Sequence, residues 1–232
     1  MRIVDLSQEI YHRRPVPGSQ ISPVVWTHVS HEESAAVLAG TGFSYMTKGI
    51  IVSDHCGTHV DAFTHLDPDP AAEAINQIPI ERFYSPAICV DVSGTPRGEY
   101  IRLDMLKAAV VASGQEVRRG DAILLYTGFP EKPTTEEFGI LSGLDAEAAT
   151  WLAEKGVVNI GTDAWSIDRR TPRETPSRNP AHVVCRDRKI LNTENLAIPL
   201  ELIGRRFTFV CLPLKIRGAS GSPVRAIAIL DA

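Results

Sequence analysis

The most informative stretch of this sequence is His55-Cys56-Gly57-Thr58-His59-Val60-Asp61-Ala62-Phe63-Thr64-His65. It holds three of the seven histidines of the chain. Together with Asp61, these histidines follow one another at steps of four, two and four residues. Imidazole and carboxylate groups are the ligands that hold Zn²⁺ or Mn²⁺ in proteins. The stretch therefore predicts one part of a metal site, whose partners must come from elsewhere in the chain.

The candidate ligands within this stretch have different possible roles. A single histidine is more often a hydrogen-bonded residue than a ligand, but four such groups in eleven residues favour metal binding. His55, His59 and Asp61 would supply two nitrogens and one or two oxygens, and the carboxylate of Asp61 can bridge two ions. His65 is either a fourth ligand or a free base beside the metal.

Two further candidate ligands, His182 and Glu194, stand far downstream. With Asp61 they would complete the ligand set of a second ion. Their chemistry alone leaves an ordinary structural role open for both. The charged turn at 186–188 lies between them, and we expect short strands at 181–185 and 189–191 to pair around it. Such pairing would bring both side chains towards Asp61.

The composition is that of an ordinary globular protein. The chain has 232 residues, of which 44% are hydrophobic and 22% charged, so it can bury a full core. Its formal charge is −4 and no Lys/Arg-rich run is present, so nucleic acid is not an expected partner. The first residues lack the apolar segment of a signal peptide, and no run approaches the roughly 18 apolar residues of a membrane helix. We expect a cytoplasmic protein with no membrane partner.

The four cysteines do not form a metal-binding or redox motif, because no CxxC spacing occurs. Cys89 and Cys211 lie in strand-like apolar runs and are expected to be buried free thiols. Cys56 is either a ligand, a nucleophile or a packing residue, and its position between His55 and Gly57 favours packing. This usage fits a reducing compartment better than a disulfide framework.

Strand-like and helix-like segments alternate along the chain, which predicts an α/β fold with a mixed sheet in a single domain, residues 1–232. Asp145 and Gly156 bracket a helix over 146–155, as N-cap and C-terminal stop. Asp104 and Gly114 similarly bracket a helix over 105–113, and a further helix is expected to begin near Asp61. Apolar, β-rich runs predict strands at 3–6, 45–53, 87–92, 122–126, 157–160, 207–212 and 224–230.

Residues 7–45 form a long segment with weak periodicity. Turns are expected at Pro15, Pro17 and Gly18, followed by an extended stretch over 23–30 in which Trp26 is the largest apolar group. Three interpretations remain open for the segment: an arm or lid over a site, a dimer contact, or a meandering surface layer.

The chemistry expected of the metal site is hydrolytic. A divalent ion with an open position lowers the pKa of its water from about 16 towards 7, which suits attack on an amide or ester carbonyl. A histidine that is not a ligand then serves as general base or acid. Other motifs are weaker: the run over 218–223 is either an anion-binding nest or, more commonly, a loop between strands. No P-loop, dinucleotide-binding fingerprint or GxSxG elbow is present.

The stretch over 55–65 resembles the motif HxGTHxDxPxH of the metal-dependent cyclase family, which includes bacterial kynurenine formamidases and isatin hydrolases. Six of its residues match that motif by position: His55, Gly57, Thr58, His59, Asp61 and His65. Downstream, Glu194-Asn195-Leu196 is similar to the family's Glu-Asn-Leu segment, and His182 to its downstream histidine. The similarity extends from Ile3 to Leu230 and includes 126–128 and 222–225.

The resemblance implies a swivelling β/β/α fold, a homodimer or homotetramer, and one or two Zn²⁺ or Mn²⁺ ions per chain. It implies that His55, His59 and Asp61 bind one ion. Asp61, His182 and Glu194 bind a second where two are present, and His65 is the catalytic histidine. One position departs from the motif, because Phe63 stands where the family has proline.

The expected function is hydrolysis of a C–N bond in a small, aromatic formamide or cyclic amide. Phe63, beside the ligands, and Trp26, in the N-terminal segment, are the candidate substrate-binding residues. Two alternatives remain: lyase or cyclase chemistry through a metal-stabilised enolate, and a metal-dependent small-molecule binding protein without turnover. The sequence leaves open the substrate, the choice between Zn²⁺ and Mn²⁺, and the number of ions.

Overall fold

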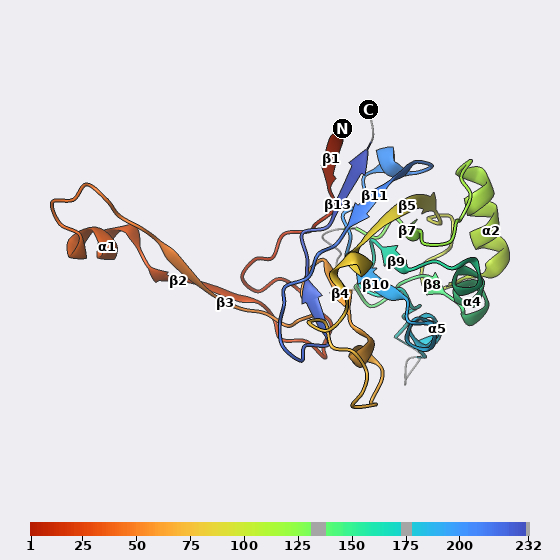
Figure 1. Ribbon diagram of the computed structural model, residues 1–232, viewed down its shortest axis with the longest axis horizontal. Helices are drawn as coiled ribbons and strands as arrows, with labels where there is room; N and C mark the ends of the chain where they lie inside the picture. Colours follow the sequence, from red (N-terminus) through yellow and green to blue (C-terminus); the bar gives the residue numbers. More distant parts are fainter. Residues whose placement is uncertain (131–137, 173–177, 231–232) are drawn as a thin grey trace.

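A curved mixed β-sheet forms the centre of the computed structural model, which describes residues 1–130, 138–172 and 178–230 (Figure 1). Within these residues the sheet has nine strands, in the order β1-β13-β11-β5-β7-β9-β10-β4-β12. β5, β7, β9 and β10 are parallel, and the outer strands pair antiparallel. The strands are β1 (Arg2–Asp5), β4 (His59–Asp61), β5 (Tyr84–Asp91), β7 (Ala122–Tyr126), β9 (Asn159–Thr162), β10 (Leu191–Glu194), β11 (Arg206–Val210), β12 (Gly221–Pro223) and β13 (Ile227–Leu230). The predicted α/β class with a mixed sheet is confirmed.

The central strands are apolar because both of their faces are buried. In β5, Ala87 and Cys89 point into one hydrophobic cluster, and Ile88 and Val90 point into another on the opposite face. Successive side chains of a strand alternate between faces, so a continuous apolar run serves both clusters. The expected burial of Cys89 and Cys211 as free thiols is confirmed.

Among the described residues, three helices cover one face of the sheet: α2 (Leu103–Ala112), α4 (Ala146–Lys155) and α5 (Pro180–Arg188) (Figure 1). α4 begins and ends as predicted. The side chain of Asp145 accepts a hydrogen bond from the Ala148 amide, and Gly156 takes the left-handed conformation with φ 82°. α2 starts earlier than predicted, with Arg102 rather than Asp104 at the N-cap. Next to this layer, β6 (Tyr100–Ile101) and β8 (Gly143–Leu144) form a short parallel pair.

The opposite face of the sheet is enclosed by the curl of the outer strands. Three short 3-10 turns lie along this part of the chain: η1 (Phe63–His65), η2 (Ile80–Phe83) and η3 (Leu200–Leu202). Phe63, Phe83 and Leu202 contribute side chains to the hydrophobic cluster on this face. The helix expected to begin near Asp61 is therefore wrong: His59–Asp61 is a strand, and a single turn follows it. Asp61 is held in the sheet by ladders to β10 and β12 on either side.

The strands predicted at 181–185 and 189–191 are also wrong. Residues 180–188 form α5, which begins with Pro180 in its first turn and ends at Lys189 in the left-handed conformation (φ 54°). The following strand, β10, starts only at Leu191. The apolar run Ala181-His182-Val183-Val184-Cys185 contains two β-branched valines that favour a strand. The segment nevertheless forms a helix, because it packs against α4 and the sheet, and these tertiary contacts outweigh the local preference.

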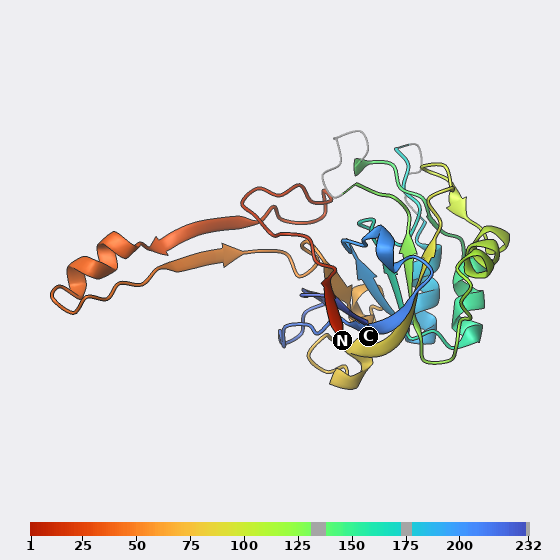
Figure 2. The same cartoon turned by 90° about the horizontal axis from the view of Figure 1, so that it is seen from above.

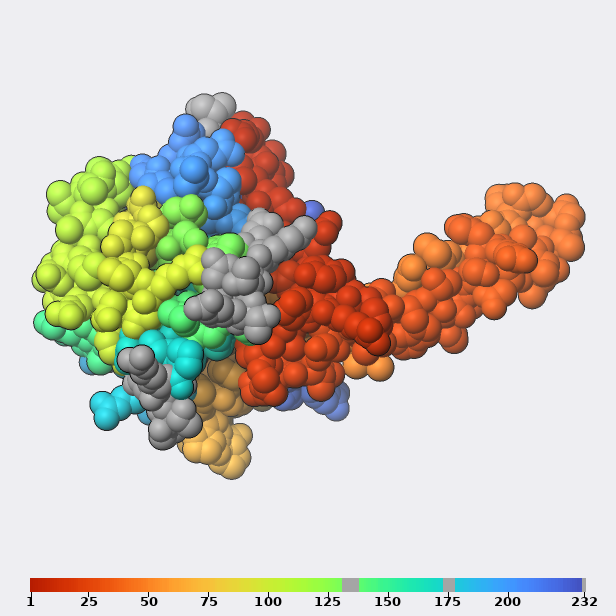
Figure 3. Space-filling model, turned by 180° about the vertical axis from the view of Figure 1, so that it is seen from behind, coloured from red at the N-terminus to blue at the C-terminus, as the bar shows by residue number. Residues whose placement is uncertain are grey.

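An arm, residues 24–51, projects from the body of the molecule (Figures 1 and 2). Its antiparallel strands β2 (Val24–Val29) and β3 (Thr47–Ile51) are joined through α1 (His31–Val37) at the far end. The ring of Trp26 lies against Gly49, where a Cβ atom would be 2.1 Å from it, so the arm needs glycine at that position. The space-filling view shows the arm standing clear of the rest of the chain (Figure 3). Of the three interpretations of the N-terminal segment, a surface layer is excluded for these residues.

Among the described residues, no helix has the length and apolar character required to cross a membrane.

Candidate metal centre

Two adjacent strands present the polar side chains of the site on one face of the sheet. His59 and Asp61 are two residues apart in β4 and therefore point the same way. In the neighbouring β10, Glu194 pairs with His59 and Asn192 pairs with Asp61. Directly opposite residues in an antiparallel pair lie side by side, so this register brings four polar side chains together. All four are buried.

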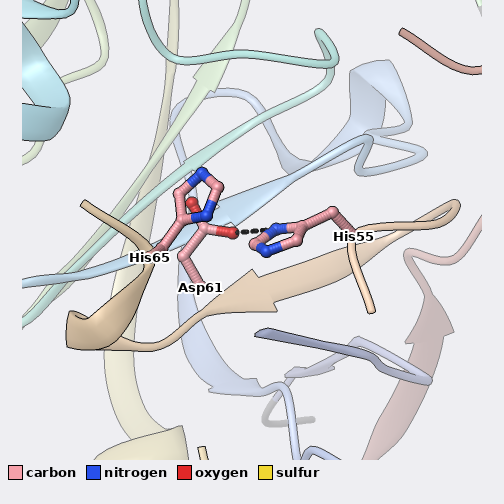
Figure 4. A group of neighbouring side chains, drawn as sticks. All are labelled: His55, Asp61 and His65. Carbon is pink, nitrogen blue, oxygen red and sulfur yellow. Dashed lines mark ion pairs between the residues drawn. The ribbon is translucent and has the colours of Figure 1, made fainter. Parts of the chain in front are cut away.

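His55 reaches this group from the loop before β4. Its Nδ1 atom lies 2.8 Å from Asp61 Oδ1 (Figure 4), and its Nε2 atom lies 2.9 Å from Ser220 Oγ. The loop turns sharply at Gly57, which has φ 65°. The ring also needs Gly221 in β12, because a Cβ atom there would be 2.7 Å from His55 Cε1. The small residues around the motif therefore admit the imidazole to the site.

One side of the site is built around His59. Its Nδ1 atom donates to the carbonyl of Gly57 at 2.9 Å, which turns Nε2 towards the carboxylates. His59 Nε2 lies 3.4 Å from Asp61 Oδ1 and 3.5 Å from Glu194 Oε2. Nitrogen and oxygen atoms thus converge from three directions, as ligands of one ion do.

This side of the site carries two buried carboxylates, those of Asp61 and Glu194. Burial opposes protonation of His59, but the neighbouring carboxylates of Asp61 and Glu194 outweigh it and raise its pKa to about 10. Burial would raise the pKa of Asp61, yet His55 and His182 hold it well below its usual range. Asp61 Oδ1 is buried and has no hydrogen-bond partner among the described residues, although His55 Nδ1 lies 2.8 Å from it. A buried carboxylate oxygen left in this way is costly, and a metal ion would satisfy it.

His182 approaches the other side of the carboxylates from α5. Its Nε2 atom lies 3.3 Å from Asp61 Oδ2 and 3.4 Å from Glu194 Oε1. Its Nδ1 atom is hydrogen-bonded to Asp168 Oδ2, a fully buried carboxylate that also accepts from the Ala181 amide at 2.7 Å. Burial opposes protonation of His182, but the hydrogen bonds with Asp168 and Asp61 raise its pKa well above the usual value. Asp168 therefore fixes the direction of this ring.

Asp168 and Asn192 are site residues that the sequence interpretation missed. Nothing in the sequence separates Asp168 from other loop carboxylates. Asn192 does carry a signal, because it precedes Glu194 by two residues and therefore shares its face of β10. Its Nδ2 atom lies 2.8 Å from Asp61 Oδ2, 2.9 Å from Glu194 Oε1 and 3.0 Å from His182 Nε2.

His65 stands at the edge of the group, on the 3-10 turn after β4. Its ring lies beside that of His55 (Figure 4), with 4.1 Å between the centroids, and its centroid is 5.9 Å from that of His182. Its own side chain is accessible from solvent. Burial of the ring edge, with the nearby imidazoles of His55 and His182, lowers the pKa of His65, although Asp61 and Glu194 act the other way. The lowered pKa favours the neutral imidazole, which can accept a proton, while its distance to His55 and Asp61 also permits ligation.

A cavity of about 280 Å³ opens over the group. His55, His59, His65, His182 and Glu194 all line it. On another wall, Trp165 stacks on Phe138 with 5.6 Å between centroids and donates from Nε1 to the Phe138 carbonyl at 2.7 Å. Arg170 places its guanidinium carbon 5.5 Å from the Trp165 ring centroid and is the only Lys or Arg among the described residues of the lining. The cavity therefore combines a polar floor with a flat aromatic wall.

The two candidate substrate-binding residues lie outside this cavity. Phe63 is 5% exposed and packs in the core, with Lys189 Nζ 4.8 Å from its ring centroid, although it also lines a smaller pocket beside Asp61, His65 and His182. Trp26 lies on the arm and is 43% exposed. A contact of either residue with substrate stays a prediction.

The remaining motif residues have structural contacts. Cys56 is fully buried, and burial raises the pKa of its thiol against the effect of Arg14, which supports the packing role. The run over 218–223 forms a loop and β12 rather than a separate site. Within it, the amide and hydroxyl of Ser220 donate to Asp54 Oδ2 at 3.0 and 2.8 Å, which orients Ser220 towards His55.

Comparisons with known proteins agree with this geometry. The family model described as putative cyclase matches residues 4–169. A kynurenine formamidase of Salinibacter ruber is 30% identical over 98% of this chain and 97% of its own length. One of Bordetella petrii is 33% identical over 77% of this chain and 78% of its own.

Solved structures with the same fold include isatin hydrolase A from Labrenzia aggregata, with a TM-score of 0.82. It is 21% identical, over 99% of this chain and 94% of its own. A predicted metal-dependent hydrolase from Bacillus stearothermophilus is also 21% identical, with a TM-score of 0.71 over 98% and 97% of the two chains. At this identity the structures establish the fold, and the curated relatives indicate an enzyme of the hydrolase type.

Proposed function

This chain belongs to the putative cyclase family, and we propose that it is a metal-dependent hydrolase that cleaves the C–N bond of a small formamide or cyclic amide. The observation that carries the proposal is the buried Asp61 Oδ1, which no described residue satisfies by a hydrogen bond, beside the nitrogens of His55 and His59. The relatives named as kynurenine formamidases support the substrate class.

The residues that would hold the ion are His55, His59 and Asp61, with Glu194 Oε2 on the same side. Their nitrogen and oxygen atoms suit both Zn²⁺ and Mn²⁺. When bound, the ion supplies a more acidic water and polarises the substrate carbonyl.

The protein's own contribution is proton transfer and positioning. Hydrolysis forms a C–O bond and breaks the C–N bond, so one proton must move from water to the departing nitrogen. His65 lies at the cavity edge with a lowered pKa, and it takes that proton and then delivers it. Trp165 offers an aromatic face to a planar substrate, and Arg170 beside it offers a cation to a polar or anionic substituent.

We also propose that two copies of the chain assemble through the arm, with a tetramer as the alternative. Apolar side chains on the arm are unusually exposed: Trp26, Phe43, Tyr45, Met46 and Ile50. A second copy would cover them. The buried, unpaired cysteines suit a cytoplasmic location.

Light scattering tests the assembly. The measured mass is expected to correspond to two or four copies of the chain. The double substitution Phe43→Asp and Ile50→Asp on the arm is expected to reduce that mass to the mass of one copy. Leu200→Asp, at an equally exposed apolar position on the body, serves as the control and leaves the mass unchanged. An unchanged mass in the arm variant would exclude the arm as the contact.

A pH-stat assay tests the reaction. Chelated protein is reloaded with Zn²⁺ or Mn²⁺ and offered N-formyl aromatics, isatin-like lactams, lactones and aliphatic amides. Release of acid from a neutral amide, dependent on the added metal, is expected for the aromatic formamides or lactams. Turnover without acid release would indicate lyase or cyclase chemistry, and metal-dependent binding without turnover would indicate a binding protein.

A further inference from the structure

The two carboxylates of the site each divide their oxygens between two sides. Asp61 Oδ1 and Glu194 Oε2 face His59, at 3.4 and 3.5 Å from its Nε2 atom. Asp61 Oδ2 and Glu194 Oε1 face His182, at 3.3 and 3.4 Å from its Nε2 atom. The arrangement thus has room for one ion on the His59 side and, in principle, another on the His182 side.

The two sides differ in how their oxygens are satisfied. On the His59 side, Asp61 Oδ1 is buried and has no hydrogen bond from the part of the chain that the structure describes. On the His182 side, the side-chain amide of Asn192 donates to Asp61 Oδ2 at 2.8 Å and to Glu194 Oε1 at 2.9 Å. The backbone amide of Ile167 adds a further hydrogen bond to Glu194 Oε1 at 2.9 Å. The His182 side therefore already holds the amide donors that a second ion would have to replace.

Asn192 occupies the space between the groups that would bind a second ion. Its Nδ2 atom is 3.0 Å from His182 Nε2, in addition to its contacts with both carboxylates. An –NH₂ group carries partial positive charge and no lone pair suited to a metal, so it competes with a cation for these atoms. Asn192 cannot be displaced along the strand, because β10 is hydrogen-bonded to β4 and β9 on its two sides.

We propose that Asn192 takes the place of a second ion, so that this chain binds one divalent ion, on the His59 side. The inference rests on the proposed metal centre and assigns its number of ions. His182 is then a positioning residue: held by Asp168, it places Nε2 3.3 Å from Asp61 Oδ2 and 3.4 Å from Glu194 Oε1 and keeps the carboxylates aimed at the single ion.

The orientation of the amide follows from the charges around it. The reverse orientation would place Asn192 Oδ1 against the two carboxylate oxygens Asp61 Oδ2 and Glu194 Oε1, with His182 Nε2 beside it. A cation at the centre would favour that orientation, and Asn192 would then be a ligand. The two orientations therefore predict different numbers of bound ions.

Metal analysis of chelated and reloaded protein, by titration calorimetry with Mn²⁺ and elemental analysis, separates them. The wild-type chain is expected to take up about one ion, and Asn192→Asp about two, since an isosteric carboxylate replaces the amide donor. Asn192→Ala, which empties the position, is expected to give the same increase. Asn76→Asp makes the same chemical change at a residue whose side chain accepts from Gly218 outside the site, and it should stay at about one ion.

The electron paramagnetic resonance spectrum of the Mn²⁺ protein gives a second readout that does not depend on turnover. The wild type should show an isolated ion, and Asn192→Asp a coupled pair. Two ions in the wild type, or one ion in every variant, would overturn the role of Asn192 while leaving the proposed hydrolase intact. Absence of any bound ion in the wild type would instead overturn the proposed function. Circular dichroism checks that each variant is folded.

Discussion

The upstream half of the site, residues 55–65, and the downstream half, residues 178–196, reach the same carboxylates in different ways. The upstream half is a loop, a three-residue strand and one 3-10 turn, so its ligands converge through local spacing. The downstream half places His182 on a helix and Glu194 on the strand after it, and only sheet pairing brings them to Asp61. In the upstream half, Asp61 Oδ1 is buried without a hydrogen-bond partner, whereas the downstream amide of Asn192 donates to both Asp61 Oδ2 and Glu194 Oε1. Proximity to a carboxylate therefore does not by itself make a histidine a metal ligand.

The largest effect is expected from the upstream half. His59→Ala removes a nitrogen that faces both Asp61 and Glu194, and hydrogen bonds elsewhere cannot replace a lost ligand. Metal content should fall to background and hydrolysis should become undetectable, as measured by elemental analysis and pH-stat assay. Normal metal content and turnover in this variant would remove His59 from the site.

His65→Ala should separate proton transfer from metal binding within the same half. The variant is expected to keep its metal and to lose about 10²–10⁴-fold in kcat, the range of general acid–base catalysis. Metal content and kcat are measured on the same preparation. If the two fall in proportion, His65 is a ligand rather than the proton carrier.

Asp168→Asn probes the downstream half, where a smaller effect is expected. The variant weakens the hydrogen bond that orients His182, and loss of such support typically costs about 10–100-fold in activity or metal affinity. For a His182 that positions carboxylates without binding metal, the loss should appear in kcat at the lower end of that range, with metal content unchanged. A loss of metal equal to that in His59→Ala would make the two halves equivalent.

The smallest effect concerns Asp163, which precedes the loop that carries Trp165 and Asp168. Burial raises the pKa of Asp163 to about 6, against the hydrogen bonds from Thr127, Gly128 and Phe129. The folded chain keeps this proton after the unfolded chain, with a pKa near 3.8, has released it. The contribution to stability is therefore complete below the unfolded pKa and is lost as pH rises through about 6.

Urea unfolding at pH 5 and pH 7 measures this contribution. The free energy of unfolding of the wild type, relative to Asp163→Asn, should be greater at pH 5 than at pH 7 by about 1 kcal/mol. A difference that is constant, or greater at pH 7, would show that Asp163 is ionised in the folded chain throughout this range.

The same contrast explains which features were predictable from the sequence. The helix between Asp145 and Gly156 was predictable because its start and stop depend on neighbouring residues. The position of the arm's strands followed from local β-rich composition, but nothing local indicated that they stand away from the body. The helix α5 was misread because its valines favour a strand, and its packing on α4 is a tertiary contact.

The candidate site divides along the same line. The grouping of His55, His59 and Asp61 was predictable because a strand and its preceding loop set their spacing. The contribution of Asn192 was not predictable from the sequence. It depends on the strand register that pairs Asn192 with Asp61, and these two residues are more than 130 positions apart in the chain. Asp168 approaches His182 through the loop after β9, a path that no sequence spacing encodes.

Anomalous diffraction from a crystal of the Zn²⁺- or Mn²⁺-loaded protein tests the central claim most directly. We expect one strong peak on the His59 side. If the ion is zinc, it should lie about 2.0–2.2 Å from the His59 nitrogen and from an Asp61 oxygen. His55 should complete the contact, and no peak should lie between Asn192 and His182. A fully loaded crystal with no peak beside His59 and Asp61 would contradict the metal centre described here.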